Sequence, residues 1–269
     1  MQIVALTAVN LKPKYLSCVP AFIDFWLSLK SSKQGITYKP KVIVIAETLP
    51  EELEKYQEWC EVFDVGSKIP SSFASQAIRV FYPSLEEADY VVTTDVDMLP
   101  MTDRLFQVAL SEISAGSEFV IGRDVLPKGQ FPICYNLATP AIWGSINSIR
   151  SNGDVLDSLA KLFEKVNFNG EFNSKHGGTG WFADQEELYR MVTEFELMGG
   201  KVERLNDSST GHLRLDRLFT PFPLNWLTLA GVALGLFTDY HVHHPISNFS
   251  KFLRSVAWLR NRRVGSNRR

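Results

Sequence analysis

The chain has 269 residues, 45% of them apolar, and its 28 basic and 30 acidic side chains leave a net charge of -2. An aromatic content of 12% excludes a disordered acidic chain, and the lack of a basic excess argues against a dedicated nucleic-acid-binding protein. The three cysteines form no CxxC or Cys/His pair, which excludes a disulfide framework and a zinc finger and favours a reducing cytoplasm.

Strands and helices alternate along the first half of the chain. Apolar, β-branched runs predict strands at residues 2–8, 41–46, 61–65 and 90–94. Apolar residues at helical spacing, or a proline at the start of the segment, predict helices at 19–29, 50–60 and 72–82. This alternation predicts an α/β fold whose mostly parallel central sheet is covered by helices on both faces.

The pattern is less regular after residue 115. Strands are expected at 119–122, 133–138, 201–205 and 237–242, and helices at 154–166 and 184–198, with a Gly- and Asn-rich loop at 167–180. No internal repeat or low-complexity linker interrupts the chain. We therefore expect a single domain over 1–250, followed by a basic C-terminal helix and tail at 251–269.

Two segments bear on membrane contact. Residues 218–238 carry no charge, but their strongly apolar part, 224–237, spans only 14 residues where a spanning helix needs about 20, so we expect a buried element. Residues 251–269 contain seven Lys or Arg and no acid. A solvated arm is favoured, with contact to an anionic membrane surface as the alternative. No signal peptide is expected, so the protein is placed in the cytoplasm, with peripheral membrane association as the alternative.

Two carboxylates, Asp95 and Asp97, follow the strand expected at 90–94. Ligands of open α/β sheets gather beyond the carboxyl ends of the strands, and on an extended backbone residues i and i+2 point to the same side. Two such carboxylates repel each other unless a cation lies between them, and oxygen ligands favour Mg²⁺ or Mn²⁺. The alternative is that the two acids only cap the next turn.

Three of the five histidines lie in the segment Thr238-Asp-Tyr-His-Val-His-His-Pro245. On a strand, His241 and His243 would share one face, and an imidazole that completes a carboxylate site favours Mn²⁺. His244 is expected at the surface.

These two segments resemble the metal-binding elements of nucleotide-sugar-dependent glycosyltransferases with the GT-A fold. The resemblance implies that Asp95 and Asp97, as the DxD pair, hold a divalent cation on the donor diphosphate together with His241, with His243 in reserve. It also implies a nucleotide-sugar-binding half at 1–115 and an acceptor half at 116–250. One departure is that no Lys-Pro-Trp follows the late histidine, as it does in one large retaining family.

The resemblance extends to other segments. Leu6-Thr-Ala-Val-Asn10 corresponds to the part that holds base and ribose, and Ser75-Gln-Ala-Ile-Arg79 to the helix with a basic residue near the donor, although Arg79 could also be a solvent-facing arginine. Cys134-Tyr-Asn-Leu-Ala138 is similar to the strand that touches donor sugar and acceptor. The residues implied for the donor are Thr7, Ala8, Asn10, Arg79, Asp95 and Val96, and those implied for sugar or acceptor include Tyr135 and Asn136.

The segment Gly177-Gly-Thr-Gly-Trp-Phe-Ala-Asp184 provides further candidates. Gly180 allows close approach of backbone to a ligand, and Trp181 can stack on a sugar face. Asp184 could act as the catalytic base or bind the acceptor. Equally, Asp184 with Glu187 three residues later is typical of a capping-box start of a helix.

We therefore expect a metal-dependent glycosyltransferase of the hexosyltransferase type, with Mn²⁺ or Mg²⁺ and a UDP- or GDP-linked sugar donor. The acceptor would be a hydroxyl of a glycan, a lipid-linked glycan or a protein-linked glycan. Arg79 would stabilise charge on the leaving group, and Asp184 would be the base if the enzyme inverts. The alternatives are a metal-dependent nucleotidyltransferase or phosphohydrolase, and a non-catalytic module that binds nucleotide or sugar.

Overall fold

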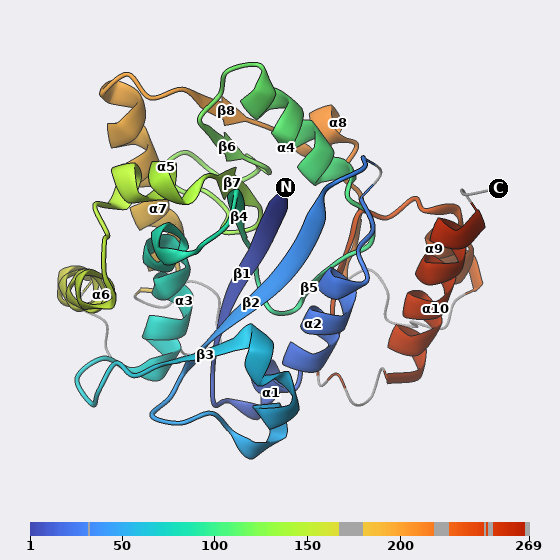
Figure 1. Cartoon of the computed structure of the whole chain (residues 1–269), viewed down its shortest axis with the longest axis horizontal. Helices are drawn as coiled ribbons and strands as arrows, with labels where there is room; N and C mark the ends of the chain where they lie inside the picture. The colour runs from blue at the N-terminus through green and yellow to red at the C-terminus, as the bar shows by residue number, and fades with distance from the viewer. Residues whose placement is uncertain (32, 167–179, 218–225, 245, 247–249, 267–269) are drawn as a thin grey trace.

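A seven-stranded sheet forms the centre of the protein (Figure 1). The computed structural model describes residues 1–31, 33–166, 180–217, 226–244, 246 and 250–266. Within them the strand order is β3-β2-β1-β4-β7-β6-β8. The strands are β1 (Gln2–Asn10), β2 (Thr37–Ile45), β3 (Cys60–Phe63), β4 (Tyr90–Thr93), β6 (Phe119–Ile121), β7 (Asn136–Ala138) and β8 (Val202–Arg204). Only β7 runs antiparallel to its neighbours in this sheet, so the expected mostly parallel sheet is confirmed.

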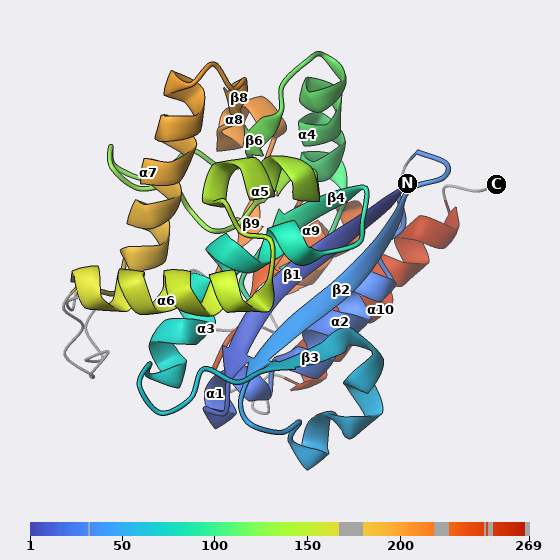
Figure 2. The same cartoon turned by 60° about the vertical axis from the view of Figure 1, so that its left-hand side comes forward.

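Helices cover both faces of this sheet, because successive side chains of a strand point to opposite faces. From β1, Ile3 and Ala5 join a core shared with α2 (Val19–Leu27), α4 (Arg104–Ser114) and α10 (Ser250–Ser266). Val4 and Leu6 join the core on the other face. The helices of that second face are α3 (Ser71–Phe81), α5 (Pro140–Asn147), α6 (Asn152–Val166) and α7 (Ala183–Leu197). Figure 2 shows this second group in front of the sheet.

A smaller sheet lies beside the first, and in it the late strand β10 pairs with β5, which follows the DxD segment. Its order is β5-β10-β9, from β5 (Met98–Pro100), β10 (Asp239–His241) and β9 (Arg214–Leu215). β5 begins directly after Asp97, and β10 pairs with it antiparallel so that His241 is opposite Met98. This pairing brings residues from the end of the chain to the DxD segment.

Several shorter helices complete the fold. They are α1 (Pro13–Leu16), the 3₁₀ helices η1 (Glu51–Trp59) and η2 (Tyr82–Leu85), α8 (Asp207–Thr210) and α9 (Trp226–Leu234). The expected buried element in 218–238 is wrong where it is described, since Trp226 and Leu234 are 72% and 73% exposed; residues 218–225 lie outside the described part. In the described residues, no helix combines the length and the apolarity needed to cross a bilayer.

Candidate active site

The two DxD carboxylates lie on a turn just beyond the end of β4. The Thr94 amide donates to the Leu6 carbonyl of β1 (3.0 Å), and the Met98 amide donates to the Asp95 carbonyl (3.0 Å). The second bond closes a turn over residues 95–98, so the backbone here is not extended, and the expectation that strand geometry aligns the two side chains is wrong. The turn instead directs Asp95 and Asp97 to different partners.

Asp95 belongs to a cluster centred on the buried Arg79 of α3. The Arg79 guanidinium donates to Asp95 through Nη1 and to Asp184 Oδ2 through Nη2 (3.0 Å), and the Cys134 thiol donates to Asp95 Oδ2 (2.9 Å). Burial alone would lower the pKa of Arg79, but the Asp95 and Asp184 carboxylates raise it above its ordinary value. Arg79 is 7% exposed, so the alternative of a solvent-facing arginine is wrong.

Asp184 lies in the first turn of α7 and is 3% exposed. Its Oδ1 accepts from the Gln185 amide (2.9 Å), and its Oδ2 accepts from Arg79. Burial raises the pKa of Asp184 to about 6, although the Arg79 charge opposes the rise. The capping-box alternative is wrong, because the N-cap is Phe182 and Glu187 pairs with Lys165 and Arg190 instead.

Asp97 forms a second cluster with basic groups from the end of the chain. Its Oδ2 lies 3.0 Å from His244 Nε2, 2.9 Å from Arg217 Nη1 and 3.5 Å from His241 Nε2. Burial raises the pKa of Asp97, but hydrogen bonds from His241 and His244 outweigh it and hold that pKa well below its usual range. Burial lowers the pKa of His241, yet its bonds to Asp97 and Asp216 raise it above the ordinary value.

The histidine pattern is only partly as expected. His241 of β10 reaches Asp97, and the Val242 amide donates to the Asp97 carbonyl (2.9 Å). His243 is not brought to the DxD segment: it is 7% exposed and its Nδ1 lies 2.9 Å from the Tyr240 hydroxyl. The expectation that His244 is a surface histidine is wrong, since its side chain is 11% exposed and contacts Asp97. Because β10 ends at His241, the alternation of a strand does not continue to residue 243.

The residues expected to contact the nucleotide lie at and beside the end of β1. This strand was expected at 2–8 and extends through Asn10, so Asn10 belongs to it together with Thr7 and Ala8. Thr7 is fully buried, and its hydroxyl has no hydrogen-bond partner within the described residues. Asn10 Oδ1 accepts from the Lys12 amide (3.2 Å). Val96 is 5% exposed and packs in the core on the α2 face. The nucleotide contacts of these residues stay predictions.

Tyr135 and Asn136, expected to touch sugar or acceptor, have inward-facing side chains. Asn136 is fully buried, and its amide donates to the Pro132 and Ile133 carbonyls (2.8 Å each). The Tyr135 hydroxyl donates to Asp239 Oδ2 (3.1 Å). Within that segment, it is the preceding Cys134 that reaches the DxD pair.

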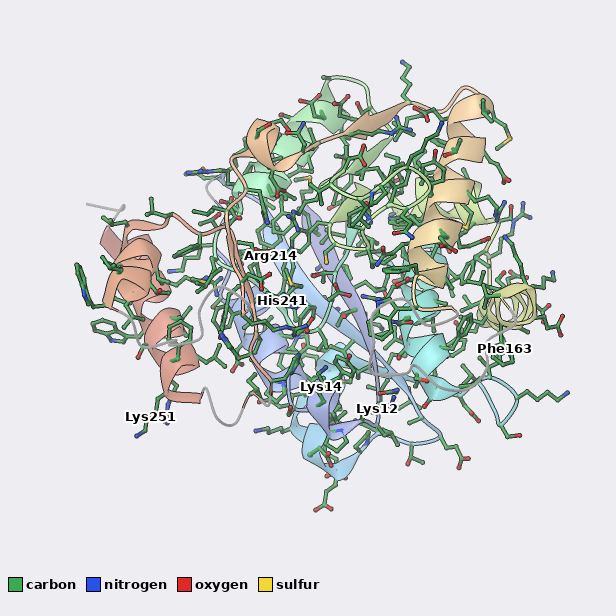
Figure 3. The ribbon with its side chains drawn as sticks, turned by 180° about the vertical axis from the view of Figure 1, so that it is seen from behind. Lys12, Lys14, Phe163, Arg214, His241 and Lys251 are labelled. Atoms are coloured by element: carbon green, nitrogen blue, oxygen red, sulfur yellow. The ribbon has the colours of Figure 1, made fainter. Side chains whose placement is uncertain are left out.

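Asp239 of β10, two residues before His241, is the centre of a buried polar network. Arg214 of β9 donates to both Asp239 oxygens, and His212 Nε2 lies 3.4 Å from Oδ1. Burial raises the pKa of Asp239, but His212 and Arg214 outweigh it and hold that pKa well below its usual range. Figure 3 shows Arg214 and His241 close together on these strands.

The Gly-rich segment is described only at its end. Gly180 has a φ of 83°, a conformation that favours glycine, and Trp181 is half-buried. The preceding residues of the motif, 177–179, lie outside the described part. The expected sugar contacts of Gly180 and Trp181 stay predictions.

Several neighbours of the DxD pair were not singled out from the sequence. Arg217 contacts Asp97, and Asp216 contacts His241. The Tyr15 ring packs edge-on against the His244 ring, with 5.9 Å between the ring centroids. Tyr15 and Lys14 belong to α1, which follows β1, and Lys12 is its N-cap; Figure 3 shows Lys12 and Lys14 below His241. The sequence could have indicated this segment, because an aromatic residue and two lysines come directly after the first strand, and ligands of parallel sheets bind beyond the carboxyl ends of the strands.

The donor types at Asp97 suit a divalent cation, but their arrangement is that of an ion-pair cluster. Asp97, His241 and His244 offer the carboxylate oxygen and imidazole nitrogens that Mn²⁺ accepts. Among the described residues, however, no group of three or more His, Cys, Asp or Glu side chains is placed to hold a metal ion. Arg217 donates to Asp97 Oδ2, the same oxygen that faces His241 and His244.

No protein-family model and no curated protein matches the sequence. Among solved structures, the chain is similar to the glycosyltransferase GlyE of Streptococcus pneumoniae TIGR4, at 15% identity and a TM-score of 0.48 over 98% of this chain and 63% of GlyE. It is also similar to mouse xyloside xylosyltransferase 1, at 10% identity and a TM-score of 0.46 over 91% and 98% of the two chains. A third neighbour is an active-site mutant of LgtC, at 12% identity and a TM-score of 0.42 over 95% and 96%.

The chain therefore spans about 63% of the length of GlyE. GlyE and the xylosyltransferase are glycosyltransferases by name. The roles of individual residues rest on the geometry of the site.

Proposed function

We propose that this protein is a nucleotide-sugar-dependent glycosyltransferase that moves a sugar from a nucleoside diphosphate to an acceptor hydroxyl. One observation carries the proposal: two charged clusters, centred on Asp95 and Asp97, lie two residues apart beyond the end of β4. One cluster joins acids to a buried arginine and the other joins an acid to two imidazoles and an arginine. A nucleotide-sugar donor needs two kinds of surroundings next to each other: positive charge for the diphosphate, and both hydrogen-bond donors and acceptors for the sugar.

The Asp97 cluster suits the diphosphate. Arg217, together with the exposed Lys12 and Lys14 near the end of β1, supplies positive charge for phosphate oxygens. A divalent cation, Mn²⁺ or Mg²⁺, held by Asp97 and His241 with Asp95, would supply Lewis-acid stabilisation of the departing nucleotide.

The Asp95 cluster suits the sugar. Arg79 presents donors while Asp95 and Asp184 present acceptors, and hydroxyl groups of a sugar require both kinds of partner. During transfer, a bond forms between the acceptor oxygen and the anomeric carbon as the bond from that carbon to the diphosphate oxygen breaks. The acceptor proton goes to Asp184 if the enzyme inverts. In a retaining enzyme it goes to the departing diphosphate oxygen, and Asp184 positions Arg79 and the sugar. The contact between Asp184 and Arg79 supports the positioning role in either case.

Calorimetric titration of UDP and GDP, with and without Mn²⁺, and assays of donor hydrolysis and sugar transfer test this function. We expect metal-dependent nucleoside diphosphate binding and turnover in the wild type, and a loss of at least about a hundredfold in turnover for Asp97→Asn with the fold retained. Asp157→Asn on α6 removes an exposed carboxylate and should leave turnover unchanged. Wild-type turnover in Asp97→Asn would refute the proposal. Binding without turnover would favour a non-catalytic module, and release of pyrophosphate from a nucleoside triphosphate would favour a nucleotidyltransferase.

A further inference from the structure

Large apolar side chains gather on one side of the molecule, on α9, the loop after it and α10. We call this the α9–α10 face and define it by its exposed members, Trp226 (72%), Leu227 (58%), Leu234 (73%), Leu236 (52%) and Trp258 (53%). The two helices pack against each other at the edge of the molecule (Figure 1). Between them lies a shallow groove of about 630 Å³ lined by Leu229, Ala230, Ala233, Arg254, Ser255, Trp258 and Leu259.

Such a concentration of exposed apolar side chains is unusual for a protein surface in water. Exposed apolar residues are normally scattered singly, and a contiguous patch indicates contact with another apolar phase or partner. α9 has no charged residue from Trp226 to Leu234, and only Gly231 and Val232 of this helix are buried. The helix therefore leaves most of its apolar surface outside the core.

The last part of the sequence, which contains α10, is basic, unlike the rest of the chain, and its described exposed basic residues are Lys251 and Arg254. Residues 251–269 carry seven Lys or Arg and no acid, whereas residues 1–250 carry 21 basic and 30 acidic side chains. Arg254 lines the groove itself, and Figure 3 shows Lys251 at the start of α10 on the outer edge of the molecule. A negatively charged surface would attract this side and repel the remainder, which sets one orientation.

We propose that the α9–α10 face docks on an anionic phospholipid surface, with its apolar side chains in the headgroup boundary and its basic residues on the lipid phosphates. Apolar residues beside Lys and Arg on helices too short to span a bilayer are the pattern of interfacial binding. A second copy of the chain fits less well, because a two-fold contact would bring both basic α10 helices together. This property goes beyond the proposed sugar transfer and does not depend on it.

Docking would also have a consequence for the candidate active site. Phe252 of α10 packs edge-on against Tyr240 of β10, with 5.6 Å between ring centroids, and Tyr240 precedes His241. The helix that would lie on the membrane is thus fixed to the strand that carries a residue of the Asp97 cluster.

Flotation of the full chain with phosphatidylcholine vesicles, with and without phosphatidylglycerol, tests the proposal. We expect binding only to the anionic vesicles, and weaker binding as salt increases. Trp226→Ser with Trp258→Ser, and separately Lys251→Glu with Arg254→Glu, should each reduce the partition coefficient by about tenfold or more. These side chains are largely exposed or line an open groove, so circular dichroism should show the native fold in both variants.

Matched controls are Leu197→Ser, at a position 82% exposed on α7, and the pair Lys128→Glu and Lys201→Glu, at exposed positions away from α9 and α10. Both controls should bind the anionic vesicles like the wild type. Absence of wild-type binding to anionic vesicles would overturn the proposal, as would equal loss in the controls. Unchanged binding of the tryptophan variant would also overturn it, because the basic tail alone would then account for the binding. A dimer that this variant abolishes, without vesicle binding, would reassign the face to self-association.

Discussion

At Asp184, burial and the charge of Arg79 act on the carboxyl pKa in opposite directions. Burial raises its pKa to about 6 against the pull of Arg79, so a fall in pH through 6 adds a proton and removes the charge that faces Arg79. If the ionised form is needed, kcat/KM should be constant above about pH 7 and fall roughly tenfold for each unit below 6. A pH–rate profile between pH 5 and 8 measures this.

The variant Asp184→Asn separates this carboxylate from other titrating groups. Its activity should be lower than that of the wild type at neutral pH, and the acid limb near pH 6 should disappear. An acid limb that persists at the same pH in Asp184→Asn would assign the titration to a group other than Asp184.

The sequence locates some residues of this site better than others. Asp95 and Asp97 are predictable because a buried β-branched strand ends just before them, where ligands of a parallel sheet gather. His244 and Arg217 are not, because their approach to Asp97 depends on the pairing of β10 with β5, a strand of three residues. Alternation along a strand favours His243 over His244, but β10 ends before either of them.

At the scale of elements, a buried ion pair joins β10 to β9 within the small sheet. Asp239 is 1% exposed and contacts Arg214 of β9, so its loss leaves a largely buried guanidinium without its carboxylate. Asp239→Asn should lower the free energy of unfolding by about 3 kcal/mol. The native pKa of Asp239 lies well below its ordinary value, so this contribution is complete at neutral pH, begins to decrease as pH falls below about 4, and is lost only as pH approaches the lower native pKa. Urea denaturation at pH 7 and at pH 3.5 measures both effects.

Asp207→Asn is the matched control for that ion pair. Asp207 pairs with Arg123 through both guanidinium arms, but its side chain is 41% exposed, so its removal should cost no more than about 1 kcal/mol. Equal losses in the two variants would contradict a special role for the buried pair.

The elements themselves follow from the sequence where the pattern is long and apolar. β2, β4 and β6 are β-branched runs, and they begin or end within a few residues of the expected positions. α4 and α5 were not expected, although Thr139 accepts from the Ile142 amide as an N-cap before a proline at the helix start. By contrast, no periodicity indicates that residues 51–59 form a 3₁₀ rather than an α helix.

At the scale of the whole molecule, the proposed donor site joins the two sheets. Asp97 lies on the turn between β4 of the large sheet and β5 of the small one, and His241 belongs to β10. A ligand bound there is bound only by the native state, so at one hundred times its dissociation constant it stabilises the fold by about 2.7 kcal/mol. For a chain of this size that corresponds to a rise in Tm of roughly 5–10 °C.

Thermal unfolding with a nucleoside diphosphate and Mn²⁺, alone and together, measures this coupling. We expect the full rise only with both ligands, because the cation and the diphosphate neutralise each other in the site. Asp97→Asn should abolish the rise, whereas Asp157→Asn should retain it. A rise of the same size in Asp97→Asn would place the ligand elsewhere on the molecule, and the link between the two sheets through Asp97 would then have no part in binding.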